Sequence, residues 1–188
     1  RQFTHSLIFI PVGGSLVGLL LHLLVGKKSG HSITRTLIFS NLGYATHALL
    51  DSFTTYGTVL LWPFSDTRFA WNLISIIDPF FTVPIILAVT LGLLTRSGKY
   101  ARAGLAWVFL YLSLAFFQQR AAVQMGEELA QSRGHEPINI DAKPSFGNII
   151  VWKVIYEFEQ SYYVDAVRVG FRPTAYEGAS IKKLDTII

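Results

Sequence analysis

The most constraining feature of the sequence is a series of four apolar runs, at residues 7–25, 36–50, 79–95 and 104–117. A transmembrane helix needs about 20 apolar residues, within a range of about 17–25. The first run meets this length, whereas the second and fourth do so only if their helices extend beyond the apolar part. Charged residues make up only 15% of the chain, against about 25% in soluble domains. We therefore expect about four transmembrane helices.

The charges divide the chain into two parts of different character. Residues 1–119 contain eight Lys or Arg and three acidic residues, whereas residues 120–188 contain eight and nine. The second part has the balanced composition of a soluble domain. We therefore predict a transmembrane helical domain at residues 1–118 and an extramembrane domain at residues 119–188. The chain has no cysteine, which excludes disulfides, Cys-ligated zinc and thiol nucleophiles.

Basic residues in the first part gather in two short loops, 26–35 and 96–103. This distribution is typical of the cytoplasmic loops of membrane proteins, and it indicates a lipid bilayer rather than nucleic acid as the partner. The rule places Arg1, the loop at 51–72 and everything after residue 120 on the outer side. We expect a multi-pass protein of a bacterial inner membrane with its C-terminal domain on the periplasmic or extracellular side.

The second part shows a helix followed by strands. Residues 119–132 favour a helix, so the fourth transmembrane helix is expected to project from the membrane. Residues 148–158 and 162–171 alternate as strands do. The predicted fold class is therefore mainly α, a polytopic membrane helical bundle with a small C-terminal α+β domain.

A polar stripe runs along one face of the second apolar segment, at the helical spacing of Ser40, Tyr44, His47, Asp51 and Thr54. His47 and Asp51 lie four residues apart, so both side chains reach the same point. Asp51 also lies near the negative end of the helix dipole, where a cation would stabilise it. Imidazole with carboxylate suits zinc or manganese. The alternative is a His–Asp hydrogen bond within the bundle, or contact of Asp51 with water.

Two further residues are expected at the same membrane face. His5 lies at the mouth of the first apolar run, where it is either a metal ligand or part of an ordinary helix-start turn. Asp78 precedes Pro79, and this pair is also the usual beginning of a helix. The shared face of His5, His47, Asp51 and Asp78 favours a common site.

Several ordered motifs resemble a known family. They are RxFTHS, HxxxDxxTxxG, WPFS and IDPxxT, at residues 1–6, 47–57, 62–65 and 77–82, with NIIVWKVIY at 148–156. Together they are similar to the YdjM-like, LexA-regulated family of bacterial inner-membrane proteins, described as predicted metal-dependent hydrolases. The resemblance implies that Thr4, His5, Ser6, His47 and Asp51 surround a metal. The family pattern also has a His directly before the residue that is Arg1 here and an acidic motif further upstream, so we expect preceding residues to complete the site.

The resulting hypothesis is a membrane-embedded, metal-dependent hydrolase with its site at the outer membrane face. His5, His47 and Asp51 would hold a divalent ion, zinc or manganese, that activates water. Asp78 would accept a proton, and Arg1 would neutralise a phosphate or an oxyanion. The expected substrate is a lipid-linked or membrane-proximal ester or phosphoester. The alternative is a non-catalytic transporter or assembly factor in which His47 and Asp51 form a structural or proton-coupled pair.

Overall fold

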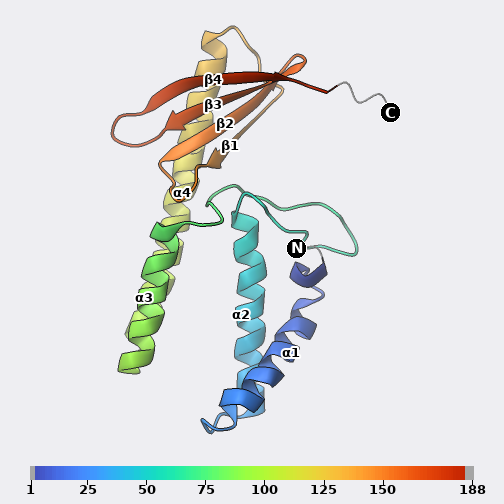
Figure 1. The fold of residues 1–188 in the computed structure, drawn as a ribbon, viewed down its shortest axis with the longest axis vertical. Helices are drawn as coiled ribbons and strands as arrows, with labels where there is room; N and C mark the ends of the chain where they lie inside the picture. The colour runs from blue at the N-terminus through green and yellow to red at the C-terminus, as the bar shows by residue number, and fades with distance from the viewer. Residues whose placement is uncertain (1–2, 185–188) are drawn as a thin grey trace. The chain divides into compact units, whose positions relative to one another are not determined.

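The computed structural model describes residues 3–184 and divides the chain into two compact units, Arg1–Trp71 and Asn72–Ile188 (Figure 1). The first unit is a helical hairpin followed by a long loop. The second unit combines two helices with a four-stranded sheet.

The hairpin of the first unit is made by α1 and α2. A short 3₁₀ turn, η1 (Phe3–His5), precedes α1 (Ile10–Leu21), which continues through a π turn, η2 (His22–Gly26). α2 (Ile33–Phe53) then returns along α1. Its first turn is capped by Ser32, whose side chain accepts a hydrogen bond from the Arg35 amide at 3.3 Å.

Glycines allow α1 and α2 to approach closely. A Cβ atom on Gly14 would lie 2.8 Å from the Cα of Asn41, and one on Gly18 would lie 3.1 Å from the Cβ of Ser40. Gly14 and Gly18 form a GxxxG pair, a motif that lets helix backbones pack against each other. The side chain of Asn41 adds a 3.2 Å hydrogen bond from its Nδ2 to the hydroxyl of Ser15.

The loop after α2 folds back onto the open end of the hairpin, where α1 begins and α2 ends. The Leu7 amide donates to the Leu60 carbonyl at 2.9 Å, and the Trp71 amide donates to the Ser52 carbonyl at 2.8 Å. These bonds fix the segment that carries η1 beside the loop.

In the second unit, a helical pair leads into the sheet. α3 (Pro79–Thr95) packs against the first part of α4 (Gly98–Ser132). Four strands follow in the antiparallel order β1-β2-β3-β4, as Asn139–Pro144, Val151–Phe158, Ser161–Arg168 and Thr174–Lys182. The sheet lies along the second part of α4 (Figure 1), where a Cβ on Gly126 would lie only 2.5 Å from Val154 Cγ1.

The end of α4 is clamped to the sheet by Arg133. Its two terminal nitrogens donate to both carboxylate oxygens of Asp165, at 2.7 and 2.9 Å, and it also donates to the hydroxyl of Tyr156 at 2.9 Å. Asp165 is buried and also accepts from the Gly178 amide. The hydrogen bonds that Arg133 donates to Asp165 raise the pKa of Arg133 above its ordinary value, so this arginine stays charged.

The predicted polytopic bundle of four transmembrane helices is wrong. Within residues 3–184, only α4 is long and apolar enough to cross a membrane by length and composition. The apolar helices at Ile10–Gly26 and Pro79–Thr95 are shorter, and the polar stripe lowers the hydropathy of α2. A four-stranded sheet occupies much of the second unit. The domain boundary expected at residues 118–119 falls within α4, which is one continuous helix.

Candidate metal centre

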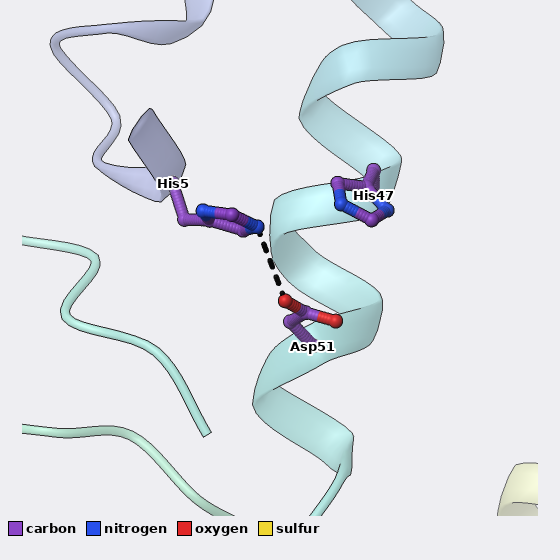
Figure 2. A group of neighbouring side chains, drawn as sticks. All are labelled: His5, His47 and Asp51. Carbon is purple, nitrogen blue, oxygen red and sulfur yellow. Dashed lines mark ion pairs between the residues drawn. The ribbon is translucent and has the colours of Figure 1, made fainter. Parts of the chain in front are cut away.

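His5, His47 and Asp51 come together in the first unit (Figure 2). One potential ligand atom from each residue lies within 4.8 Å of the other two. His5 faces α2 from η1, and His47 and Asp51 lie one turn apart on α2. The Nε2 atom of His5 forms an ion pair with Oδ2 of Asp51 at 3.2 Å. His5 therefore lies beside the Asp51 carboxylate at the end of α2, and it is a cation there only when protonated.

Neighbouring side chains orient His5. Its Nδ1 atom lies 2.9 Å from the hydroxyl of Thr4, which leaves Nε2 directed to Asp51. The hydroxyl of Tyr44 donates to the Thr4 carbonyl at 2.9 Å and so ties η1 to α2. The buried hydroxyl of Ser6 donates to the Phe3 carbonyl at 2.7 Å and closes the turn.

The three residues differ in exposure. The side chains of His5 and Asp51 are 16% and 14% exposed, whereas His47 is exposed. The rings of His5 and His47 have centroids 5.2 Å apart and are inclined by 44°. The hydroxyl of Thr54 donates to the Asp51 carbonyl at 2.7 Å and holds the last turn of α2. Of the two histidines, His5 is the one whose ion pair with Asp51 is described.

The donor set fits a divalent ion. Two imidazoles and a carboxylate are the protein ligands of many catalytic zinc sites, which keep a fourth position for water. Two ligands about 2.1 Å from one tetrahedral ion lie about 3.4 Å apart, close to the 3.2 Å between His5 and Asp51. His47 is further away but has room to turn because it is exposed. A histidine that binds a metal through one ring nitrogen usually makes a hydrogen bond with the other, and the contact between Nδ1 of His5 and the Thr4 hydroxyl is of this kind.

Two further residues, Arg1 and Asp78, were predicted to take part in this site. Arg1 lies outside the described residues. Asp78 belongs to the second unit, where one carboxylate oxygen accepts from the Phe81 amide at 3.2 Å and the other accepts from the Tyr111 hydroxyl at 2.7 Å. These contacts are those of a helix cap that also ties α3 to α4, and a catalytic role for Asp78 stays an untested prediction.

A groove of about 670 Å³ extends from the cluster along the hairpin. His47 and Tyr44 lie at one end and Arg35 and His31 at the other, with apolar side chains such as Phe39 between them. This groove was not predicted from the sequence. The signal for it is the continuation of the polar stripe upstream of Ser40, through Thr36.

The described residues thus combine a helical hairpin that carries a candidate metal centre with a helix, α4, long and apolar enough to cross a bilayer, and these features are typical of a helical membrane protein. The chain belongs to the YdjM inner membrane protein family, whose sequence pattern matches residues 1–122. This confirms the family resemblance of the motifs within residues 1–82. The inner membrane is accordingly its location.

A curated relative agrees with this assignment. The inner membrane protein YbcI of Escherichia coli strain K12 is 37% identical over 81 residues, which cover 40% of this chain and 44% of the relative. The chain therefore matches less than half of that relative's length. No solved structure matches the chain.

Proposed function

We propose that this chain is a metal-dependent hydrolase of the inner membrane, with His5, His47 and Asp51 as its metal ligands. The observation that carries the proposal is the convergence of these three side chains from η1 and α2, with their ligand atoms within 4.8 Å of one another. Their chemistry suits zinc, and manganese is the second candidate.

The three side chains would have different roles in such a site. A divalent ion, when bound, would lower the pKa of a water molecule on it and polarise the oxygen of the bond to be broken. Asp51 provides the negative charge that retains a cation, and His5 is pre-oriented by the Thr4 hydroxyl. His47 is exposed and lines the groove, so it lies where a substrate would arrive.

The proposed substrate is a lipid-linked or membrane-proximal ester, and a phosphoester is the preferred form. Support comes from the inner-membrane location and from the groove, which combines apolar side chains with Arg35 at the end remote from His47. Arginine suits phosphate or carboxylate groups.

The alternative is a non-catalytic transporter or assembly factor that uses a His–Asp pair for structure or proton coupling. The 3.2 Å contact between His5 Nε2 and Asp51 Oδ2 favours it, because this contact forms without a metal.

Metal content separates the two functions. Purified protein should bind Zn²⁺ stoichiometrically in a titration followed by mass spectrometry of the metal. His5→Ala, His47→Ala and Asp51→Ala should each lose most of it, whereas His31→Ala should retain it, since His31 lies outside the cluster. Retention of one zinc by all three variants would contradict the proposed ligands. Zinc binding without hydrolysis of any aryl ester or phosphodiester tested would favour the non-catalytic function.

We also propose that the sheet of the second unit lies on the periplasmic side. Three basic residues cluster at the start of α4, namely Arg96, Lys99 and Arg102. Fewer follow the uncharged stretch of α4 before the sheet begins, namely Arg120 and Arg133. The positive-inside rule assigns the more basic end to the cytoplasm.

A further inference from the structure

Two loops of the sheet in the second unit lie at the same end. The antiparallel register pairs Val151 with Arg168, so the loop at 145–150 and the turn at 169–173 are neighbours. A cavity of about 430 Å³ lies there, and its lining includes Ile150, Arg168, Phe171 and Arg172 together with Gln118 of α4. The two loops therefore lie beside α4 at the level of Gln118.

That level is where the apolar part of α4 ends. Residues 103–119 carry no charged side chain and are flanked by Arg102 and Arg120. At 1.5 Å per residue this stretch is about 26 Å long, close to the hydrocarbon thickness of about 30 Å. α4 is the described helix long and apolar enough to cross a bilayer, and a bilayer centred on this stretch would place Gln118 at the membrane–water interface.

The loops present apolar side chains to their surroundings at this level. Phe171 is fully exposed, Phe146 is 75% exposed and Ile150 is 51% exposed, and Phe117 on the adjoining turn of α4 is 68% exposed. The amide of Gly147, in the first loop, bonds the hydroxyl of Ser75 at 3.4 Å, so this loop is fixed to the segment before α3. Such a concentration of exposed apolar groups marks an interaction surface.

Two arginines accompany the apolar side chains. The Nη2 atom of Arg168 donates to the Arg172 carbonyl at 3.1 Å and to the Thr174 hydroxyl at 3.4 Å, which fixes the turn. The described ion pairs of residues 3–184 include neither Arg168 nor Arg172. Guanidinium groups bind phosphate oxygens in a planar, bidentate manner.

We propose that this end of the sheet is a binding site for an anionic phospholipid of the bilayer that α4 enters. The lipid phosphate lies between Arg168 and Arg172, and Phe146, Ile150 and Phe171 insert beside its acyl chains. The chemistry of the site favours a phospholipid over other ligands. Its arginines and its exposed apolar side chains lie together at the depth where the phosphates of a bilayer meet the acyl chains. The site lies in the second unit and does not depend on the metal centre.

The absence of cysteine allows the insertion to be tested with single labels. A nitroxide on Phe171→Cys or Phe146→Cys, in full-length protein in vesicles of phosphatidylglycerol and phosphatidylcholine, should be more accessible to oxygen than to a water-soluble nickel complex. A label on Gln160→Cys, in the turn at the opposite end of the sheet, should show the reverse. Equal access of the nickel complex to positions 171 and 160 would overturn the proposal.

The phosphate contact is tested by a pair of single-charge variants. Arg172→Gln should retain about fivefold less phosphatidylglycerol after detergent washing, because one arginine near an anionic surface contributes about 1 kcal/mol. Lys182→Gln removes the same charge from an exposed position at the other end of the sheet and should retain the wild-type amount. Lipid counts would be measured by mass spectrometry. Equal retention by both variants would overturn the role of Arg172, whereas equal loss would show a non-specific charge effect and also overturn it.

Discussion

At the scale of single residues, Thr4 is the group that sets the direction of the His5 ring. Its hydroxyl lies 2.9 Å from Nδ1 of His5, and such outer hydrogen bonds typically change metal affinity by about 10–100-fold. Thr4→Val should therefore weaken zinc binding by about that factor without loss of the folded protein. Affinity would be measured by competition with a chromophoric chelator.

Thr46→Val is the matched control for this change. The hydroxyl of Thr46 bonds only the Gly43 carbonyl of its own helix, and the side chain is exposed on α2. Equal zinc affinities of Thr4→Val and Thr46→Val would contradict the orienting role of Thr4.

The members of the site were predictable to different degrees. His47 and Asp51 follow from helical spacing alone, since residues four apart share a face. His5 could be added only through the membrane-face argument and the family resemblance, because no local pattern relates η1 to α2. The bond from Tyr44 to the Thr4 carbonyl was not predictable, since a sequence carries no signal for which backbone carbonyl a tyrosine meets.

At the scale of elements, the contact between α1 and α2 supports the metal centre. A Cβ on Gly14 would lie 2.8 Å from the backbone of Asn41, so Gly14→Ala should force the helices apart at a cost of about 1–3 kcal/mol. Zinc retention should fall as well, because only residues 6–9 separate α1 from η1, which carries His5. Urea unfolding in detergent and metal content would measure the two effects.

Gly43→Ala provides the comparison, because a Cβ there meets nothing within 4 Å. In a helix this substitution should stabilise by about 0.5–1 kcal/mol. A Gly14→Ala protein as stable as Gly43→Ala would contradict the close packing of the hairpin.

The clamp between α4 and the sheet gives a second element-scale prediction. Arg133→Met removes the partner of the buried Asp165 carboxylate and should cost about 3 kcal/mol, in the range for breaking a buried pair. Glu177→Gln should change stability by less than about 0.5 kcal/mol, because Glu177 is exposed and lies 4.0 Å from Arg133. Chemical unfolding followed by tryptophan fluorescence would report both; equal losses would contradict the clamp.

The strands illustrate which elements a sequence reveals. β2 and β3 were predicted because their apolar residues alternate and one face is buried against α4. β1 was missed because it is six residues long and includes Lys143 and Pro144. β4 was missed because nearly all of it is exposed, so no apolar period marks it. Pairing with β3 holds it in place.

At the scale of the whole molecule, the sequence predicted the membrane association but overestimated the number of spans. Apolar content alone does not fix a helix end. The run at 7–25 becomes a turn at 7–9, an α-helix at Ile10–Leu21 and most of a π turn at His22–Gly26. Its α-helical part is 12 residues long, below the range of about 17–25 for a spanning helix. Polar residues of the second run face the metal centre and the groove, which lowers the hydropathy of α2. α4 is long because it continues past residue 118 to support the sheet.

The orientation of α4 across the membrane is a prediction about the whole molecule. The positive-inside rule predicts that the first end of α4, with Arg96, Lys99 and Arg102, is cytoplasmic. We therefore expect alkaline phosphatase fused after residue 135 to be active and phosphatase fused after residue 97 to be inactive. Green fluorescent protein at the same two positions should give the opposite pattern, which controls for expression. Active phosphatase at residue 97 alone would invert the orientation, and it would place the lipid-binding end of the sheet in the cytoplasmic leaflet. Equal phosphatase activity at both positions would mean that α4 does not cross the membrane, and the interfacial position of Gln118 would fail with it.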